Sequence, residues 1–347
     1  MDVRSVDVVL PNYNKVEYIA ECLDSLQAQT YPHWRCIVID GYSDDGSWEI
    51  LTERAQNDDR FELHQLGRIG LYKSWNKGLS KVQNPYFAIL TSDDIWEPNW
   101  LSRAVQSMKT HDAVAVASRT RSIDSSSNPG EVTKLNRFGE HLLATSTEPV
   151  EKWPGVACSV ATMFVGSIFT SIHSLVMSTE LLETMRFAPA HGSAADWAWA
   201  VEIGLYGPIV YHKDVSAYWR CYDGQASGVD FEVREENGQH VIDLFEALRP
   251  RIAARLPNAA QDTFFCESNR LLQIDLPYFF ARPSLSAVFE DPRRGTSKLL
   301  QLLLKYPNIV FREGLSLLLG KERYINTRRL NAAKRVLEPL FETVQSA

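Results

Sequence analysis

The sequence has no long apolar segment and no leader-like segment at its amino terminus. Its longest weakly polar stretch, residues 156–169, is interrupted by hydroxyl-bearing residues and a glycine. It is shorter than the roughly 20 apolar residues that a helix needs to cross about 30 Å of hydrocarbon. Met1–Ser5 leads directly toward a predicted strand and lacks the basic and apolar regions of a signal peptide. We therefore expect a cytoplasmic protein that is soluble or at most bound to a membrane surface.

Cysteine is scarce and follows no pattern of cross-linking. The chain of 347 residues has five cysteines, an odd number, and they form no C-x-x-C pair. This pattern argues against a disulfide framework or a structural zinc site and is typical of reduced thiols. The five positions are Cys22, Cys36, Cys158, Cys221 and Cys266.

Positive charge is in deficit over most of the chain. The formal net charge is −7, which argues against a nucleic-acid partner. Residues 293–347 nevertheless carry eleven Lys and Arg against four Glu, an excess of +7, and the 292 residues before them carry 25 basic against 39 acidic residues, or −14. Two interpretations of this basic region stay open: a solvated helical face, or a surface that docks on an anionic membrane face.

The familiar glycine-rich phosphate-binding loops are also absent from the sequence. It contains neither the Walker A lysine motif nor G-x-G-x-x-G. A P-loop kinase and a dinucleotide dehydrogenase are therefore disfavoured. If the chain binds a nucleoside diphosphate, a divalent metal ion has to neutralise the charge of that group.

The first hundred residues alternate between strand-like and helix-like segments. Such alternation is typical of an α/β fold with a mostly parallel sheet. Asn14 and Glu17 have the spacing of a capping box that starts the first helix. The other predicted helices cover residues 48–55 and 70–80, and the predicted strands cover residues 6–10, 36–39, 61–64 and 86–90.

The rest of the chain divides into a mixed region and a helical region. Residues 124–130 are polar or turn-forming and predict a flexible surface loop or lid. From about Asp230 the apolar residues repeat at helical period, and Pro307 should end the helix that contains Leu299. The predicted domains are residues 1–230, with a nucleotide-binding part at 1–95 and an acceptor-binding part at 96–230, and a helical region at 231–347.

Acidic residues follow two of the predicted strands. Asp93 and Asp94 come after the strand at 86–90, at the sheet edge where open α/β folds bind ligands. Carboxylate oxygens bind Mg²⁺, whose remaining ligands are often substrate phosphates. The alternative is that Asp94 caps a helix starting at Ile95.

Asp40 follows the strand at 36–39 in the same way. An acid at this place can accept hydrogen bonds from a ribose hydroxyl or a base. The nearby Asp45 or Ser47 is expected instead to cap the next helix.

Taken in order, these motifs resemble those of the family 2 glycosyltransferases. The similar segments are P-N-Y-N at 11–14, V-I-D-G-Y-S-D-D-G-S at 38–47, G-L-Y-K-S-W-N-K-G at 70–78 and S-D-D at 92–94. The resemblance is clear to about residue 100 and weaker to about residue 228. It implies a GT-A fold, which is Rossmann-like with a mostly parallel central sheet, here followed by an α-helical extension. It also implies an inverting transferase that uses a nucleotide-diphosphate sugar, such as a UDP-sugar, with Mg²⁺ or Mn²⁺.

The resemblance assigns residues to the nucleotide and the metal. The assigned positions are Pro11 and Tyr13 at the base, Asp40 at the nucleoside, and Asp93 with Asp94 at the metal and diphosphate. The sequence departs from the family at Gly41 and Thr91, where many members have acids. These departures leave fewer contacts with the nucleotide and the metal.

The resemblance also implies a catalytic base farther along the chain. Asp196, followed by the aromatic Trp197, matches the second acid of the family's usual pair, and Ala195 replaces the first. An apolar environment would raise the pKa of Asp196 toward a value useful for a base. The alternative is that Asp196 caps a helix at residues 197–205. Trp197 is a candidate contact for the acceptor sugar.

Two further positions belong to weaker parts of the resemblance. Residues 218–227 are similar to a family segment that closes over the diphosphate, and Arg220 would be its cationic partner for phosphate. Tyr222 stands where the family usually has a histidine. His173 lies near the part that shapes the acceptor pocket in related chains, although a lone histidine is more often structural.

We therefore predict an inverting glycosyltransferase that acts on a glycan or lipid-linked acceptor in cell-surface polysaccharide synthesis. The basic carboxyl-terminal helices would place it peripherally on the inner membrane face. One alternative is a nucleotidyltransferase, although residues 11–14 do not form the glycine-rich basic loop with which such enzymes usually begin. The other is a non-catalytic glycan- or nucleotide-binding module, which the missing acids at Gly41, Thr91 and Ala195 would suit.

Overall fold

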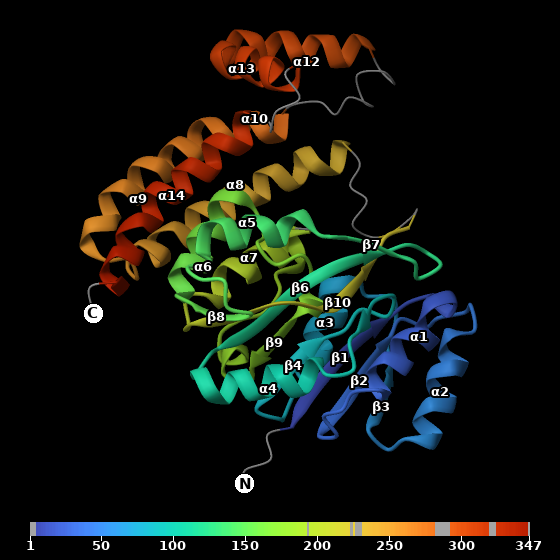
Figure 1. Cartoon of the computed structure of the whole chain (residues 1–347). Helices are drawn as coiled ribbons and strands as arrows, with labels where there is room; N and C mark the ends of the chain where they lie inside the picture. Colours follow the sequence, from blue (N-terminus) through green and yellow to red (C-terminus); the bar gives the residue numbers. More distant parts are fainter. Residues whose placement is uncertain are drawn as a thin grey trace. The chain divides into compact units, whose positions relative to one another are not determined.

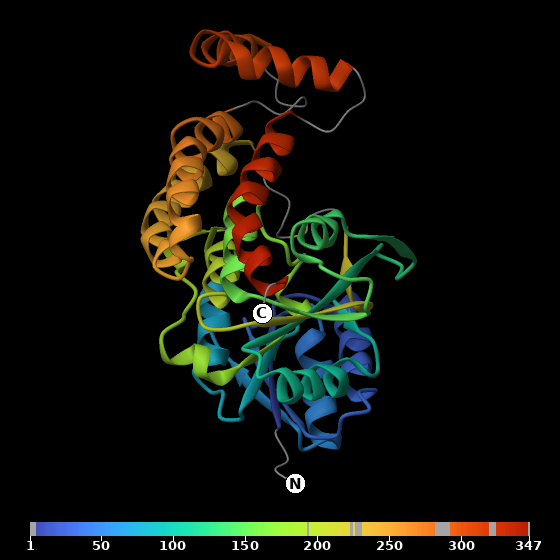
Figure 2. The same ribbon diagram turned by 60° about the vertical axis from the view of Figure 1, so that its left-hand side comes forward.

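The computed structural model of the chain describes residues 5–192, 194–222, 225, 231–281, 292–318 and 324–345. The chain folds into two compact units. The first comprises residues 1–158, 168–190 and 202–223, and the second comprises residues 159–167, 191–201 and 224–347. The sheet lies in the blue-to-yellow part of the ribbon, and the orange-to-red part is helical (Figures 1 and 2). The helical unit therefore includes two short segments from within the range predicted as the first domain.

A ten-stranded mixed sheet forms the centre of the first unit (Figure 1). Its main path is β3-β2-β1-β4-β9-β6-β10-β5, while β7 pairs with β6 and β8 pairs with β10. β1, β2, β3, β4, β6 and β10 run in one direction, so the predicted α/β class with a mostly parallel sheet is confirmed. The strands are β1 (Val6–Asn12), β2 (Trp34–Asp40), β3 (Phe61–Gln65), β4 (Tyr86–Ile89), β5 (Ile95–Trp96), β6 (Ala115–Ile123), β7 (Pro129–Val132), β8 (Val150–Trp153), β9 (Leu175–Ser178) and β10 (Ile209–Arg220).

The four strands predicted from the sequence form one parallel half of this sheet. Each is present as β1, β2, β3 or β4, and each runs parallel to its neighbour in that half. Helices connect them, since parallel strands need a crossover. The helices between Val16 and His111 are α1 (Val16–Gln27), α2 (Ser47–Asn57), α3 (Leu71–Leu79) and α4 (Trp100–His111). Next along the chain come α5 (Lys134–Leu143), α6 (Gly155–Val165) and α7 (Ala194–Ile203).

Helices cover both faces of the parallel half. On one face alternate strand residues, among them Val8 and Leu10, pack in one core with Ile19 of α1 and Trp100 of α4. Because strand residues alternate between faces, Val9 points to the other side. There α3 packs so closely that a Cβ added at Gly78 would lie 2.3 Å from Val9 Cγ1. Glycine at this position allows the close approach of the helix.

α1 begins at Val16, but the predicted capping box does not form. Asn14 has a positive φ of 50°, and its side chain bonds with Asp44. The Val16 amide donates instead to Asp45 Oδ2 at 2.8 Å, and Asp45 Oδ1 accepts from the Ser47 amide at 3.0 Å. One carboxylate therefore serves the amino termini of both α1 and α2. The capping-box prediction was wrong because the acceptor came from another loop.

The chain after Asp94 forms a strand where the capping alternative predicted a helix. Ile95–Trp96 is β5, which pairs antiparallel with β10, and α4 begins only at Trp100. Asp94 Oδ1 accepts a hydrogen bond from the Arg220 amide and not from a helix. The capping alternative for Asp94 was therefore wrong, because a distant strand supplies the partner.

The polar segment at residues 124–130 is held in place by local hydrogen bonds. Asp124 Oδ1 accepts from the amides of Ser126 at 2.8 Å and Asn128 at 2.9 Å. The last two residues belong to β7, which pairs with β6. The surface position agrees with the prediction, whereas the lid motion stays a prediction.

The carboxyl-terminal part of the second unit is helical, as the sequence predicted. α12 ends at Lys305 and α13 begins at Pro307, which is the predicted break. Within the described ranges, none of the helices is long and apolar enough to cross a membrane. The helices are α8 (Phe231–Ala253), α9 (Asn258–Arg270), α10 (Leu276–Ala281), α12 (Pro292–Lys305), α13 (Pro307–Leu318) and α14 (Tyr324–Gln345), with a π-helical turn (Leu271–Asp275) between α9 and α10.

Candidate active site

The carboxyl ends of β1 and β2 bring Asn12 and Asp40 side by side. Asp40 is fully buried, and its Oδ2 accepts from Asn12 Nδ2 at 2.8 Å and from Ser43 Oγ at 2.6 Å. Its Oδ1 accepts from the Ser43 amide at 3.0 Å and from Gln65 Nε2 at 3.3 Å. These neutral donors satisfy both oxygens and fix the orientation of the carboxylate at the strand end.

Tyr13 is the accessible aromatic residue beside this network. The residue is 36% exposed, and the Arg68 guanidinium lies 4.5 Å from the ring centroid. A Cβ at Gly41 would meet Tyr13 Cδ2 at 3.0 Å, so a side chain there would crowd the ring. Pro11 is buried within β1. The open face of Tyr13 therefore offers a flat surface on which a base could stack.

Asp93 lies among polar groups and keeps one carboxylate oxygen available. Lys15 Nζ is 3.2 Å from Asp93 Oδ2, and Tyr222 OH donates to the same oxygen at 2.7 Å. Among the described residues, Asp93 Oδ1 accepts no hydrogen bond. Burial, and then the bond to Asp93, raise the pKa of Tyr222 far above its ordinary value, so its hydroxyl stays a donor.

Asp94 points into the protein and is 3% exposed. Its Oδ1 accepts from the Arg220 amide at 2.9 Å, and its Oδ2 lies 3.0 Å from His173 Nδ1 and accepts from Thr91 Oγ1. Both oxygens are therefore occupied by protein partners. The acidic pair is divided, with Asp93 at the accessible edge and Asp94 in the interior.

Arg220 supports this turn from within the protein. The residue is fully buried, and its Nε donates to the Asp93 carbonyl at 2.8 Å. Its other nitrogens bond the Asp124 carbonyl at 3.0 Å, Ser127 Oγ at 2.8 Å and the Glu21 carboxylate at 2.5 Å. The predicted phosphate contact would require Arg220 to give up one of these acceptors. Residues 223, 224, 226 and 227 of the predicted closing segment lie outside the described residues.

His173 is fully buried as well. Its Nδ1 lies 2.8 Å from Ser171 Oγ and 3.0 Å from Asp94 Oδ2, and its carbonyl accepts from Trp96 Nε1 at 2.7 Å. Burial favours the structural alternative for this residue, and the acceptor role stays a prediction.

Asp196 and Trp197 belong to the second unit. Asp196 lies in the first turn of α7, so the alternative that it caps a helix starting at Trp197 was wrong. Asp196 is exposed to solvent. Desolvation by the surrounding protein nevertheless raises its pKa to about 6, although the hydrogen bond from the Trp197 amide acts to lower it. Trp197 is half-buried, and its Nε1 donates to the Thr162 carbonyl at 3.1 Å.

The acidic side chains suit a divalent metal only if the substrate supplies other ligands. Within the described part of the chain, no group of three or more His, Cys, Asp or Glu side chains is placed to hold a metal ion. Asp93 offers one available oxygen, and Mg²⁺ commonly binds through one or two carboxylates together with substrate phosphates. These residues fit a metal ion that binds with a diphosphate.

No local sequence motif predicted a role for Lys15, Glu21 or Arg68. Lys15 and Glu21 lie at the start and in the middle of α1, and folding brings them to Asp93 and Arg220. The only local signal was the position of Lys15 directly after the segment at 11–14.

Comparison with known proteins places these strand-end residues in a family. Residues 7–168 match the sequence model of glycosyl transferase family 2. This part of the chain is a family 2 glycosyltransferase domain. TuaG of Bacillus subtilis (strain 168), a glycosyltransferase named for teichuronic acid biosynthesis, is 35% identical over 104 residues, or 30% of this chain and 41% of TuaG. Glycosyltransferase GlyG of Streptococcus pneumoniae is 33% identical over 122 residues, or 35% of this chain and 40% of GlyG. The chain thus matches about two fifths of the length of these relatives.

Solved structures share the fold of the glycosyltransferase domain and of the helical region. TarS 1–349 of S. aureus in complex with UDP has a TM-score of 0.59 at 19% identity, and the match covers 98% of this chain and 92% of that chain. The mannosyltransferase PcManGT from Pyrobaculum calidifontis, in complex with GDP-Man and Mn²⁺, has a TM-score of 0.56 at 18% identity and coverage of 98% and 87%. At these identities the likeness shows the fold alone, and the predicted GT-A fold is confirmed.

Proposed function

We propose that the chain is an inverting glycosyltransferase that moves a sugar from a nucleotide-diphosphate sugar to a hydroxyl acceptor. The observation that carries this proposal is the division of the acidic pair: Asp93 keeps a carboxylate oxygen for a ligand, while Asp94 anchors the turn from inside. The family 2 domain supports the same function. Because the curated relatives are glycosyltransferases, transfer is favoured over nucleotidyl transfer and over a non-catalytic module.

The nucleoside of the donor would bind at the ends of β1 and β2. Tyr13 would stack on the base, and Asp40 would accept a hydrogen bond from the ribose or the base in place of its present bond from Gln65 Nε2. That TarS and PcManGT have been solved with UDP and GDP-Man supports a nucleotide donor. We take the nucleoside to be uridine.

The diphosphate would bind next to Asp93. Mg²⁺ or Mn²⁺, held by Asp93, would neutralise the charge of the departing nucleoside diphosphate. The Lys15 ammonium, close to Asp93, would add positive charge for the phosphate, and Tyr222 would keep the Asp93 carboxylate oriented. Arg220 would hold the backbone of Asp93 from behind.

Asp196 would act as the general base. It would take the proton from the acceptor hydroxyl, whose oxygen attacks the anomeric carbon as the bond from that carbon to the diphosphate breaks. A pKa raised by desolvation toward about 6 suits this task, and the exposed surface of Asp196 lets a hydroxyl approach. Trp197 would contribute an apolar surface for the acceptor sugar.

The acceptor would be a growing cell-surface glycan or a lipid-linked precursor. The names of relatives support such an acceptor, since TuaG is named as a glycosyltransferase of teichuronic acid biosynthesis.

Separate measurements of binding and turnover test the proposal. Wild-type protein with Mn²⁺ and a panel of UDP- and GDP-sugars should release nucleoside diphosphate with at least one donor. Asp196→Asn should abolish transfer while donor affinity stays within about twofold, and Asp93→Asn should remove the Mn²⁺-dependent part of donor binding. Asp59→Asn, at an exposed surface acid, is the control. Wild-type protein that neither transfers nor hydrolyses any donor would contradict the proposal.

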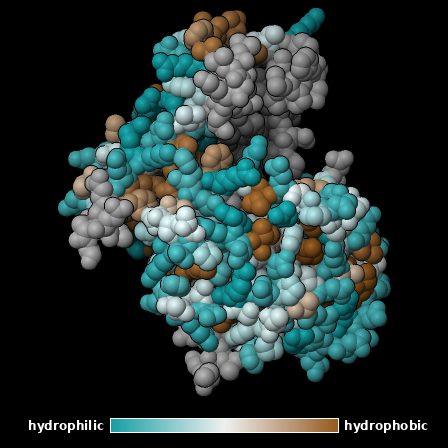
Figure 3. Space-filling model, viewed as in Figure 1, coloured by the Kyte–Doolittle hydropathy of each residue, from teal (hydrophilic) through white to brown (hydrophobic). Residues whose placement is uncertain are grey.

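The face of α12 and α13 favours a membrane surface as a partner. Of twelve exposed large apolar side chains in the described residues, six lie on these two helices: Leu299, Leu300, Leu303, Leu304, Phe311 and Leu315. Figure 3 shows a brown patch on the upper helices. On the buried side Leu302 and Ile309 join a small core, so the two helices are amphipathic. The exposed Arg293, Lys305 and Arg312 would pair with anionic headgroups.

Vesicle binding tests this partner. The protein should co-sediment with phosphatidylglycerol vesicles and not with phosphatidylcholine vesicles, and high salt should release it. Leu304→Glu together with Phe311→Glu should abolish binding without changing the melting temperature. Phe265→Glu, at an exposed aromatic of α9, should have no effect on binding. Equal binding by the double variant would contradict this role.

A further inference from the structure

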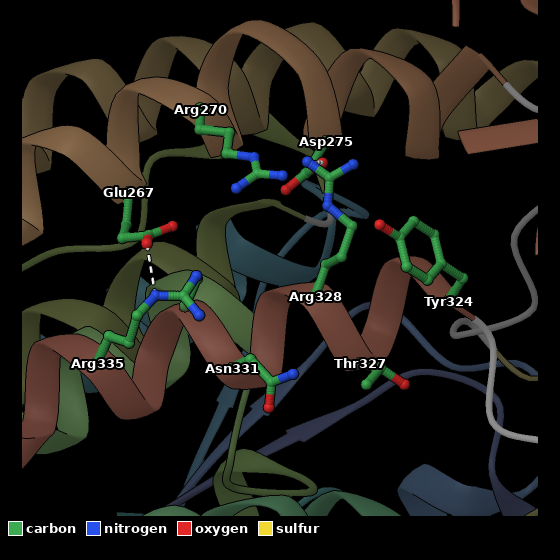
Figure 4. A pocket seen from close by; sticks show the side chains of 9 residues that line it. Glu267, Arg270, Asp275, Tyr324, Thr327, Arg328, Asn331 and Arg335 are labelled. Atoms are coloured by element: carbon green, nitrogen blue, oxygen red, sulfur yellow. Dashed lines mark hydrogen bonds and ion pairs between the residues drawn. The ribbon is translucent and has the colours of Figure 1, made fainter. Parts of the chain in front are cut away.

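A polar pocket lies within the helical unit, between the end of α9, the π-helical turn and α14 (Figure 4). Its volume is about 220 Å³. A cavity needs only about 10–15 Å³ to hold one water molecule, so this pocket has room for a larger guest. All but one of the lining residues are polar or charged, and Ala332 is the exception. The pocket therefore favours a hydrophilic ligand.

Arginine is in excess over acid in this pocket. Arg328 Nη2 pairs with Asp275 Oδ1 at 3.0 Å, and Arg335 Nε pairs with Glu267 Oε1 at 2.6 Å. Within the described ranges, the third arginine, Arg270, makes no ion pair or hydrogen bond. Three guanidinium groups against two carboxylates leave a local charge of +1.

Asp275 does not occupy all of the arginine N–H donors that face the pocket. The Asp275 side chain is 5% exposed, and within the described residues its Oδ1 has no aligned hydrogen bond despite the close Arg328. Figure 4 shows the Arg270 and Arg328 side chains both extending toward Asp275 from opposite sides. Each guanidinium has five N–H donors and no acceptor, so donors remain in excess. Such a surplus of donors favours an anionic guest.

We propose that this pocket binds a phosphate-type oxyanion through Arg270, Arg328 and Asn331. Arg328 and Asn331 are three residues apart on α14 and lie on one face of the helix, and Arg270 approaches from α9. Donors from two helices match the three acceptor oxygens of a phosphate better than the two oxygens of a carboxylate. Asp275 would orient Arg328, and the pair of Arg335 and Glu267 would border the site. The inference does not depend on the proposed transferase activity, because it concerns residues of the second unit alone.

The phosphate could belong to a soluble phosphorylated compound or to a lipid headgroup. Calorimetric titration of the full-length protein with inorganic phosphate and pyrophosphate tests the soluble source. Co-sedimentation with vesicles of phosphatidylcholine, with and without phosphatidate, tests the lipid source.

Variants of the full-length protein assign the binding to this pocket. Arg270→Gln should weaken binding of pyrophosphate, or of phosphatidate vesicles, by about tenfold or more, and Arg328→Gln should do the same. Arg255→Gln, at an exposed arginine in the turn after α8, should bind like the wild type. Because Arg270 is exposed, its substitution should leave the melting temperature unchanged. If the wild type binds neither probe, or if both pocket variants bind as well as Arg255→Gln, the pocket is only a structural network of charges.

Discussion

Asp93 and Asp94 are neighbours in the sequence but have different surroundings. Asp94 is enclosed by the Arg220 amide, His173 and Thr91, which together compensate its buried charge. Asp93 has Lys15 and Tyr222 on one oxygen and keeps the other for a ligand. At the scale of single residues, the site therefore depends on which way each carboxylate points.

Tyr222→Phe tests the orientation of Asp93. We expect it to weaken Mn²⁺-dependent UDP binding by about tenfold, because a hydrogen bond to a charged group contributes about 1.5–3 kcal/mol. Isothermal titration measures the change. Tyr218→Phe, which removes a hydroxyl bonded to Glu97 and lies on β10 four residues before Tyr222, is the matched control and should bind normally. Unchanged affinity in Tyr222→Phe would show that the hydroxyl has no part in the site.

Asp196 should set the acid limb of the pH profile. A general base has to be deprotonated, so kcat/KM should rise with pH through the pKa of Asp196, with a midpoint between the ordinary 3.8 and about 6. Measurement of transfer from pH 4 to 8 locates the midpoint. Asp196→Asn should remove this limb together with most of the activity. A wild-type rate that is flat across this range would argue against Asp196 as the base.

At the scale of helices and strands, the start of a helix can depend on a residue far from it in the sequence. α1 takes its amide acceptor from Asp45, which also receives the Ser47 amide at the start of α2. Asn14, which has the local capping-box spacing, bonds with Asp44 instead. The acidic loop after β2 therefore has a structural role in joining two helices, apart from its resemblance to a nucleotide-binding motif.

Asp45→Ala should destabilise the sheet unit by about 1–2 kcal/mol, because two helix ends lose an acceptor and each such loss typically costs 0.5–2 kcal/mol. Chemical denaturation followed by tryptophan fluorescence measures the difference. Asp44→Ala is the neighbouring control, and it should cost less because Asp44 is exposed. Equal losses in the two variants would mean that the double capping contributes little.

On the scale of the whole molecule, the two units interleave along the chain. The segment at 159–167 belongs to the helical unit, where the Phe164 carbonyl accepts from Arg329 Nε at 2.5 Å and the Phe164 ring lies 6.2 Å from that of Phe264. Phe164 is fully buried. A cut at residue 230 would therefore separate this segment from the helices that cover it.

A fragment of residues 1–230 should consequently fold poorly. We expect a lower melting temperature and stronger binding of a hydrophobic dye than in the full chain, since Phe164 would lose its cover. Calorimetry and dye fluorescence measure both effects. Phe164→Ser in the fragment should reduce the dye binding. A fragment as stable as the full chain would instead support an independent domain at 1–230.

The sequence by itself determined the parallel half of the sheet and the chemical character of the site. Continuous apolar segments at 36–39 and 86–90 predicted β2 and β4, as expected of buried strands. The mostly apolar segment at 6–10, which includes Asp7, predicted β1, and the alternating segment F-E-L-H at 61–64 predicted β3. The acids at the strand ends and the family resemblance followed from the same local segments. The order of these motifs required no knowledge of distant contacts.

Only the tertiary structure decided what each acid contacts. The pairing of β5 with β10 turned Asp94 inward, and α1 brought Lys15 beside Asp93. The helical unit likewise assembled Arg270 and Arg328 around one pocket from different helices. Hydrogen bonds and charges act over a few ångströms, and residues distant in the sequence come within that range only when the chain has folded.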